Sequence, residues 1–174
     1  MISIVGRKEA GKTTVLVALA AELTRRGVRV MTIKHGAHPA DMDRPGKDTW
    51  RHWHEGRAER VLLEAPGQRV LLQRDPDPAD PMSLARRYLD SADAVLVEGF
   101  TRAPLPKIEV FRRAAAERPI FAPGNLDADH WVAMLTDDPG FRAPFLVLRF
   151  TDTAWLPTLA TLLWERATIV PPVA

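Results

Sequence analysis

The sequence opens with an apolar run, a glycine-bearing loop and an amphipathic segment, and this order constrains the fold more than any other feature. Residues 6–13 read Gly-Arg-Lys-Glu-Ala-Gly-Lys-Thr, which satisfies the phosphate-loop pattern G-x-x-x-x-G-K-[ST] in full. Residues 2–5 before the loop predict a short buried strand. Apolar side chains after the loop recur at the helical spacing i, i+3, i+4 and i+7: Leu16, Leu19, Ala20 and Leu23. A second strand over 28–33 completes a βαβ unit, which indicates a parallel sheet.

The chemistry of the loop explains its residue types. Glycines let the backbone curl so that successive N–H groups point inward, and the helix start adds unpaired donors and partial positive charge. Lys12 can bridge outer phosphates, the Thr13 hydroxyl can ligate Mg²⁺, and Thr14 can donate to an inner phosphate. We therefore predict that a nucleoside triphosphate is bound by one continuous segment: Gly6, Arg7, Lys8, Glu9, Ala10, Gly11, Lys12, Thr13 and Thr14.

The pattern along the whole chain predicts an α/β fold with a doubly wound, mostly parallel sheet, that is, a P-loop NTPase fold in a single domain over residues 1–174. An added β-hairpin is expected over 61–63 and 70–72, around the turn pair Pro66-Gly67. Residues 75–81 are proline-dense and predict an exposed loop. Asp48 or Thr49 is expected to cap a helix over about 47–57. Further helices are expected over 83–90 and from 152, and further strands over 94–97, 108–111, 119–122, 132–135 and 145–148.

An acidic residue stands at each end of the apolar run 94–97. Glu98 follows the run, so it belongs to the carboxyl edge of the sheet, where the phosphate loop also lies. Asp93 precedes the run and is expected to be a boundary residue at the opposite edge. We therefore predict that Thr13 and Glu98 are the metal ligands, with Glu98 acting directly or through water.

A polar loop with histidines and carboxylates follows the second strand. His35, His38, Asp41 and Asp43 could bind a transition metal, orient the attacking water, or form a solvated loop. Of these, Asp41 and Asp43 are the better candidates, because phosphate chemistry beside a phosphate loop needs a second carboxylate. The candidate catalytic residues are therefore Lys12, Asp41, Asp43 and Glu98.

Composition and charge exclude several classes of protein. The 24 basic and 22 acidic residues leave a net charge of +2, and no basic run is long enough for a nucleic-acid arm. Cysteine is absent, so disulfides, Cys-ligated zinc and iron–sulfur clusters are excluded. The uncharged stretch Thr153–Trp164 falls short of the roughly 18 apolar residues that a membrane span needs. We expect a cytoplasmic protein with neither a nucleic acid nor a membrane as partner.

Three blocks of the sequence together resemble the MobB family, the adapter proteins of molybdopterin-guanine dinucleotide biosynthesis. The blocks are residues 11–14, residues 32–35 with 41–52, and residues 93–100 with 106–110. The phosphate loop alone is common to a vast superfamily, whereas the second and third blocks are much more specific in order and spacing. Ala10 stands where the family usually has a serine or another small polar residue, which should weaken little because the backbone makes the cradle.

The resemblance implies a homodimeric P-loop protein that binds GTP with Mg²⁺ and hydrolyses GTP slowly. It implies a partner, the molybdopterin guanylyltransferase of the MobA type, which joins GMP to molybdopterin, and it makes molybdopterin a candidate ligand. By the same resemblance Lys12 and Thr13 serve phosphate and metal, Glu98 is the metal-side carboxylate, and Asp41 or Asp43 faces the γ-phosphate.

Two questions stay open at the level of sequence. The guanine-reading string N-K-x-D is absent; residues 135–138 (Leu-Thr-Asp-Asp) could present an aspartate to guanine or form an ordinary turn. Two other functions compete with the adapter. A small-molecule kinase would use lid arginines, and a metal-insertion GTPase would use His35 and His38. The candidate lid arginines are Arg102, Arg112, Arg113 and Arg118.

Overall fold

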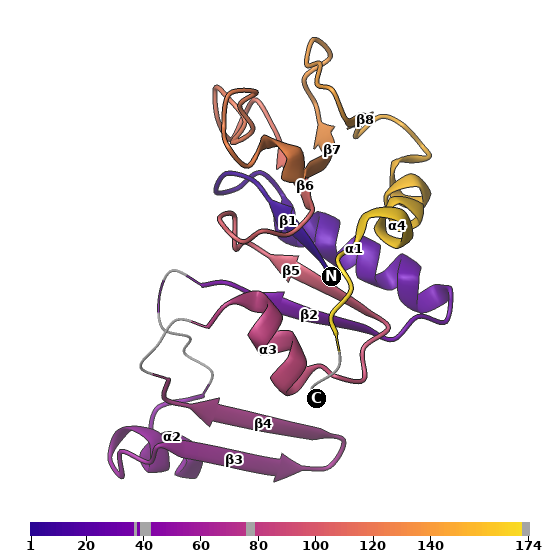
Figure 1. Ribbon diagram of the computed structural model, residues 1–174. Coiled ribbons are helices and arrows are strands. Elements are labelled where there is room, and N and C mark those ends of the chain that lie inside the picture. Colours follow the sequence, from indigo (N-terminus) through magenta and orange to yellow (C-terminus); the bar gives the residue numbers. More distant parts are fainter. Residues whose placement is uncertain (37, 39–42, 76–78, 172–174) are drawn as a thin grey trace. The chain divides into compact units, whose positions relative to one another are not determined.

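The computed structural model describes residues 1–36, 38, 43–75 and 79–171 (Figure 1). The chain divides into two compact units: Met1–His35 with Asp80–Ala174, and Gly36–Ala79 between them in sequence. The single domain expected over the whole chain stays a prediction. Within the described residues, no helix combines the length and the apolar character needed to cross a bilayer.

The first unit is built on a six-stranded sheet in which every neighbouring pair is parallel. The strand order is β2-β5-β1-β6-β7-β8, so the first strand lies inside the sheet. This arrangement confirms the predicted α/β fold with a mostly parallel sheet. The strands are β1 (Ile2–Val5), β2 (Val30–Lys34), β5 (Ala94–Glu98), β6 (Lys107–Phe111), β7 (Trp131–Thr136) and β8 (Leu146–Arg149).

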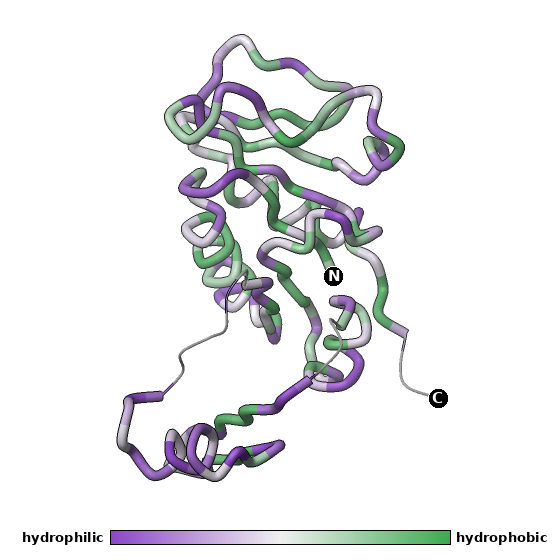
Figure 2. The backbone as a smooth tube through the Cα atoms, turned by 90° about the vertical axis from the view of Figure 1, so that its left-hand side faces the viewer, coloured by the Kyte–Doolittle hydropathy of each residue, from purple (hydrophilic) through white to green (hydrophobic). Residues whose placement is uncertain are grey.

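Helices cover both faces of this sheet, as a doubly wound fold requires (Figure 1). Helices α1 (Lys12–Arg25) and α4 (Trp155–Arg166) pack on one face through Leu19 and Leu159, both fully buried. Helix α3 (Pro81–Tyr88) packs on the other face through Ala85 against Val95. A short 3₁₀ helix, η1 (Ala128–His130), precedes β7. The hydrophobic stretches of the chain coincide with these strands and inner helix faces (Figure 2).

The second unit contains the predicted added hairpin. Strands β3 (Arg60–Ala65) and β4 (Gln68–Gln73) pair antiparallel, and the turn Pro66-Gly67 joins them with Gly67 at φ 78°. Helix α2 (Asp48–His54) belongs to the same unit and packs against β3. The turn pair therefore set the hairpin register as expected.

One strand predicted from the sequence is absent, and one predicted strand boundary was wrong. Residues 119–122 form no strand, because the side chain of Glu109 binds the backbone N–H groups of Ile120 and Phe121 that a sheet ladder would use. The second strand begins at Val30 rather than Val28, since the Val28 N–H donates to Leu23 at the end of α1.

The exposed loop predicted over 75–81 was wrong at its last residue. Residues 76–78 lie outside the described residues, but Pro81 is the first residue of α3 instead of part of a loop. Proline fits a first helical position, where its missing N–H has no partner to lose. The Asp80 carboxylate accepts hydrogen bonds from the N–H groups of Met82 and Ser83 and caps the helix. The Ser83 hydroxyl, which donates to Asp80 Oδ2, together with these backbone hydrogen bonds holds the pKa of Asp80 below its usual value.

Candidate nucleotide-binding site

The predicted phosphate loop connects β1 to α1 with an unusual backbone. Gly6, Glu9 and Gly11 all have positive φ, at 150°, 63° and 94°. A Cβ atom on Gly6 would lie 2.3 Å from the carbonyl oxygen of Val110, so a glycine is required where the loop crosses the neighbouring strand β6. The loop therefore leaves β1 pressed against β6, at the carboxyl edge of the sheet.

The helix that follows begins with unpaired donors. Gly11 is the N-cap of α1 and has no side chain to bind the N–H groups of the first turn. Such a helix start attracts anions through its free donors and its dipole. The Lys12 Nζ donates to the carbonyl oxygen of Arg7 at 2.8 Å, so its ammonium group lies across the loop.

Thr13 and Glu98, 85 positions apart in sequence, meet beside the loop. The Thr13 Oγ1 lies 3.0 Å from Glu98 Oε1 and 2.9 Å from Glu98 Oε2, and the hydroxyl donates to the carboxylate. Glu98 ends β5 and is only 8% exposed, and the Lys34 Nζ from the adjacent strand β2 lies 3.5 Å from its Oε1. A hydroxyl and a carboxylate both offer hard oxygen ligands, the kind of ligand that Mg²⁺ prefers.

His35 is packed onto the segment after β5. Its N–H donates to the Glu98 carbonyl at 2.9 Å, and its ring centroid lies 4.5 Å from that of Phe100. Gly99 has φ 92°, and a Cβ there would lie 3.1 Å from the His35 Cβ. His38 is exposed, and among the described residues no group of three or more His, Cys, Asp or Glu could hold a metal ion.

The second carboxylate loop divides into a described and an undescribed part. Asp41 lies outside the described residues. Asp43 is in the second unit, where its carboxylate accepts from the Arg44 N–H at 2.7 Å and from the Thr49 hydroxyl at the start of α2. The hydrogen bond from Thr49, then that from Arg44, lowers the pKa of Asp43. The expected cap at Asp48 or Thr49 was therefore wrong: the N-cap is Lys47, without a side-chain hydrogen bond. A catalytic role for Asp41 or Asp43 stays a prediction.

Two buried charged residues on β6 were not singled out by the sequence analysis. Glu109 is fully buried and accepts from the N–H of Ile120, the N–H of Phe121 at 2.9 Å and the indole N–H of Trp131 at 2.9 Å. Burial raises the pKa of Glu109, and these three hydrogen bonds oppose that rise. The signal in the sequence is a charged side chain inside an otherwise apolar strand.

The other buried charge is Lys107, two positions earlier on the same strand. Its Nζ donates to the carbonyl oxygens of Ala103 at 2.8 Å and Leu105 at 3.2 Å, and lies 3.3 Å from His130 Nδ1. Burial lowers the pKa of Lys107. The ammonium group also lies 5.0 Å from the centre of the Trp131 ring. Lys107 thus holds the start of β6 to the segments before β6 and β7.

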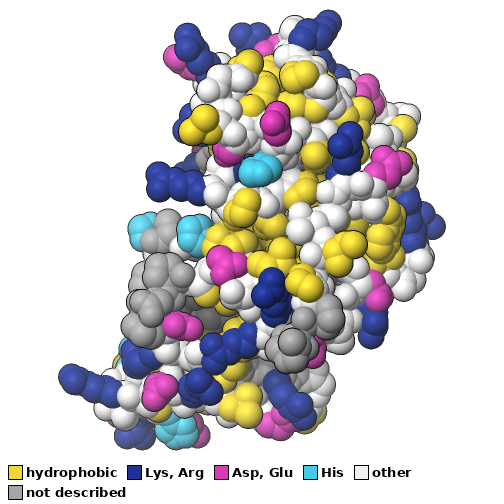
Figure 3. Space-filling model, in the orientation of Figure 1, with side chains coloured by type: hydrophobic (Ala, Val, Ile, Leu, Met, Phe, Trp, Pro, Cys, Tyr) yellow, Lys and Arg dark blue, Asp and Glu magenta, His cyan; other side chains and the backbone are white. Residues whose placement is uncertain are grey.

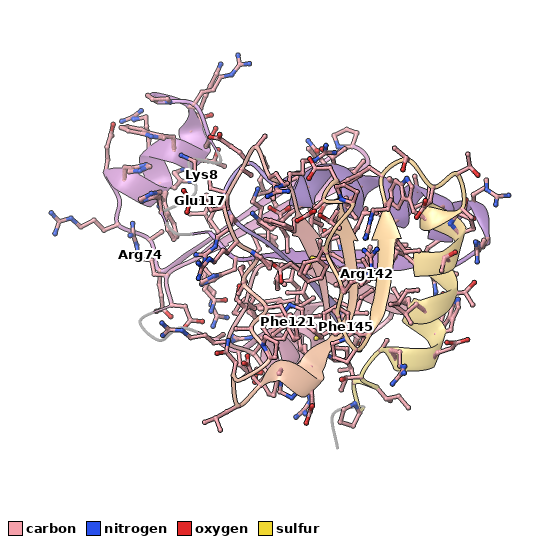
Figure 4. All side chains as sticks on the ribbon, turned by 90° about the horizontal axis from the view of Figure 1, so that it is seen from above. Lys8, Arg74, Glu117, Phe121, Arg142 and Phe145 are labelled. Carbon is pink, nitrogen blue, oxygen red and sulfur yellow. The ribbon has the colours of Figure 1, made fainter. Side chains whose placement is uncertain are left out.

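The aspartates after β7 are engaged in a turn. Asp137 Oδ1 accepts from the Arg113 N–H at 3.0 Å, and Asp138 Oδ1 accepts from the Gly140 N–H at 2.9 Å. The Arg113 guanidinium also pairs with Asp138 at 3.6 Å. These contacts favour the ordinary turn over a guanine-reading motif. Elsewhere in this unit, the rings of Phe121 and Phe145 meet edge to face with their centroids 4.7 Å apart, and Arg142 lies on the connection between β7 and β8 (Figure 4).

The opposite edge of the sheet carries a hollow lined by both apolar and charged side chains. It measures 580 Å³ and lies at the amino ends of β1 and β5, between α3 and the chain after α4. Hydrophobic side chains gather on this face (Figure 3). Asp93 lies at this edge as predicted and pairs with Arg29 at 2.9 Å, which lowers the pKa of Asp93 to about 2. The hollow is lined in part by Met1, Ala85, Leu89, Leu163, Trp164 and Ile169.

Together, a parallel sheet, a glycine loop of this conformation and a helix that starts with unpaired donors define an α/β protein of the P-loop NTPase-like class. Within that class, the chain belongs to the MobB family: the family model described as molybdopterin guanine dinucleotide synthesis protein B matches residues 1–137. The resemblance drawn from the three sequence blocks is thereby confirmed.

Relatives with assigned names agree with this family. The chain is 37% identical over 114 residues to the molybdopterin-guanine dinucleotide biosynthesis adapter protein of Haemophilus influenzae, a match that spans 65% of this chain and 64% of the relative. It is 36% identical over 132 residues to the protein of the same name from Escherichia coli, covering 74% of this chain and 73% of that relative.

Solved structures agree with the fold. A MobB homologue from Bacillus stearothermophilus superposes with a TM-score of 0.66 at 24% identity, covering 94% of this chain and 97% of the other. MobB from Bacillus subtilis superposes with a TM-score of 0.67 at 20% identity, covering 96% and 97%. At this level of identity the comparison establishes the fold.

Proposed function

We propose that this chain is a GTP-binding adapter with weak Mg²⁺-dependent GTPase activity that assists the attachment of GMP to molybdopterin. Membership of the MobB family and the names of the Haemophilus influenzae and Escherichia coli relatives support the adapter role. The contact between Thr13 and Glu98 is the structural observation that carries the nucleotide and metal part. It places a hydroxyl and a carboxylate together beside the phosphate loop.

In this proposal both the backbone and the side chains of the loop contact the triphosphate. Backbone N–H groups of the loop and of the start of α1 would surround the phosphates. Lys12 exchanges its bond to the Arg7 carbonyl for the outer phosphates, which are stronger acceptors because they are charged. Thr13 and Glu98 would hold Mg²⁺, which neutralises phosphate charge when bound.

The same set of groups suits slow hydrolysis. Asp43, the described member of the pair expected to face the γ-phosphate, binds Thr49 and Arg44 in the second unit. Because these hydrogen bonds already occupy the Asp43 carboxylate, we expect it to be a weak general base, and slow turnover of the nucleotide suits an adapter. The proposed partner is a molybdopterin guanylyltransferase of the MobA type, with molybdopterin as a candidate ligand and a homodimer as the working assembly. Family membership supports this role over the kinase and the metal-insertion protein.

Isothermal titration of GTP against ATP, with and without Mg²⁺, tests the proposal. We expect GTP to bind more tightly than ATP and Mg²⁺ to strengthen the binding. Lys12→Ala removes charge-assisted hydrogen bonds of about 1.5–3 kcal/mol, so triphosphate affinity should fall roughly tenfold or more. Arg25→Ala is the matched control, because it removes one positive charge from the far end of the same helix. Equal affinities for GTP and ATP, or an unchanged Lys12→Ala, would contradict the proposal.

The adapter role has its own assay. The chain is added to a MobA-type guanylyltransferase with GTP and molybdopterin, and formation of the guanine dinucleotide is followed with time. We expect faster or more complete product formation with the wild type and less with Lys12→Ala. An identical time course with and without the chain would contradict the adapter role but leave nucleotide binding standing.

A further inference from the structure

An arginine and two aromatic rings form a stack beside the phosphate loop. The guanidinium carbon of Arg112 lies 3.8 Å from the centre of the Phe150 ring. The Phe150 ring in turn meets Trp155 edge to face, with centroids 6.5 Å apart. We refer to Arg112, Phe150 and Trp155 as the arginine–aromatic stack. None of these side chains belongs to the loop motif.

The strand register brings the stack to the edge of the sheet that binds ligands. Phe111, Thr136 and Arg149 are register partners across β6, β7 and β8. Arg112 and Phe150 directly follow the first and last of these, so both leave the sheet at its carboxyl edge. Because β7 lies between β6 and β8, the two side chains meet over the end of β7.

The stack is adjacent to the place where the loop becomes a helix. A Cβ on Gly11 would lie 3.6 Å from the Arg112 Nε. Within the part of the chain that the structure describes, no carboxylate forms an ion pair with Arg112, whereas the next residue, Arg113, pairs with Asp138. Arg112 is half-buried. A cation beside the phosphate cradle is therefore left without an anionic partner.

Local hydrogen bonds hold the backbone beneath the stack. The Arg149 N–H donates to Asp152 Oδ2 at 2.6 Å, and the Asp152 N–H donates back to the Arg149 carbonyl at 3.0 Å, which closes a turn around Phe150. The Arg112 carbonyl accepts from Ala115 at 3.0 Å. A ring and a guanidinium held in this way need little further ordering when a ligand binds.

From this geometry we infer that Arg112, backed by Phe150, is the platform on which the purine base of the bound nucleotide stacks. The inference rests on the proposed function, because the phosphates must occupy the loop for the base to reach β6–β8. A guanidinium is planar and stacks readily on bases and aromatic rings, so one face can contact Phe150 while the other contacts the base. Stacking reads no base edge, so GTP and ATP would both use this platform.

Comparing GTP with inorganic tripolyphosphate isolates the base, because tripolyphosphate carries phosphates alone. Arg112→Lys keeps the charge and removes the planar group. We expect it to weaken GTP binding roughly 5- to 150-fold, the range of base stacking, and to leave tripolyphosphate binding nearly unchanged. Phe150→Leu should give a smaller loss with the same selectivity for GTP. Arg113→Ala, which removes a neighbouring charge outside the stack, should leave the ratio of the two affinities unchanged.

The outcomes separate this inference from the proposed function. If Arg112→Lys weakens GTP and tripolyphosphate equally, Arg112 acts on phosphate and the base platform is refuted; an unchanged GTP affinity refutes it as well. If the wild type binds tripolyphosphate as tightly as GTP, phosphate binding by the loop is supported and base stacking on Arg112 is refuted. If the wild type binds neither, the proposed function itself fails. Thermal unfolding of each variant verifies folding, and Arg112→Lys decides the question if Phe150→Leu does not fold.

Discussion

Replacing Glu109 tests how the ligand-binding edge of the sheet is supported. The two carboxylate oxygens divide their hydrogen bonds unequally: Oε1 accepts from the Ile120 N–H, and Oε2 accepts from the Phe121 N–H and the Trp131 indole. Glu109 is the register partner of Val5, the last residue before the phosphate loop. The carboxylate therefore ties the segment around Phe121 to the strand beside that loop.

Glu109→Gln has nearly the same shape but only one acceptor oxygen. With the amide oxygen in the place of Oε2, the Phe121 and Trp131 bonds remain, while the amide nitrogen faces the Ile120 N–H, donor against donor. A buried donor without an acceptor costs about 1–3 kcal/mol. Glu109→Leu leaves all three donors without an acceptor and should cost more, at least about 3 kcal/mol at the low end of that range.

Thermal and urea unfolding measure these losses. For a chain of this length, about 2–4 °C per kcal/mol predicts a fall in Tm of roughly 2–12 °C for Glu109→Gln. The urea midpoint should fall while the dependence on urea concentration is retained. Glu117→Gln makes the same change at an exposed position of the segment after β6 (Figure 4) and should leave both midpoints unchanged.

A stable Glu109→Leu would refute this reasoning. Burying a carboxylate costs free energy, and a well-packed apolar replacement can offset the loss of its hydrogen bonds. If Glu109→Leu unfolds at or above the wild-type midpoint, the cost of burying the charge exceeds the value of its three hydrogen bonds. Glu109 would then be retained for some purpose other than stability.

Three further predictions concern the two edges of the sheet. Asp93 has its pKa lowered to about 2 by Arg29, so the stability from this pair is present above the ordinary carboxyl pKa and is lost as the pH falls toward 2. Urea unfolding at several pH values should therefore show a steeper acid loss in the wild type than in Asp93→Asn; parallel curves would contradict this. Gly6→Ala places a Cβ 2.3 Å from the Val110 carbonyl oxygen, so overpacking should destabilise the fold by about 1–3 kcal/mol and lower Tm. Gly124→Ala, where a Cβ meets open space, is the control and should leave Tm unchanged. Glu98→Gln should slow Mg²⁺-dependent GTP hydrolysis more than it weakens GTP binding, and an undiminished rate would show that another carboxylate serves the metal.

The local parts of the fold followed from the sequence. The loop pattern, the helical stripe through Leu19 and the turn at Pro66-Gly67 depend on neighbours within a few positions, and each of these three elements is present. Glu98 was placed at the carboxyl edge of the sheet because it follows an apolar run, and the structure brings it to Thr13. In these cases short-range pattern and strand direction were enough.

The remaining features depend on segments that meet only in the folded chain. Residues 119–122 have the apolar character of a strand, but their N–H groups are bound by Glu109, a distant side chain. Asp43 was predicted to be catalytic because it is a carboxylate beside a phosphate loop. In the structure it accepts a hydrogen bond from Thr49 in the first turn of α2. The pairing of Arg112 with Phe150 requires that β6 and β8 flank β7, and no local pattern specifies that order.

The contact of Lys34 with Glu98 has a consequence for the order in which ligands arrive. The ammonium group 3.5 Å from the carboxylate already balances its charge in the protein alone. A free divalent cation would have to compete with that lysine for the Glu98 carboxylate, with little electrostatic gain. A cation already chelated by the phosphates brings its own surplus of negative charge. We therefore expect metal and nucleotide to bind as one complex, and magnesium added alone to leave the thermal unfolding of the protein unchanged.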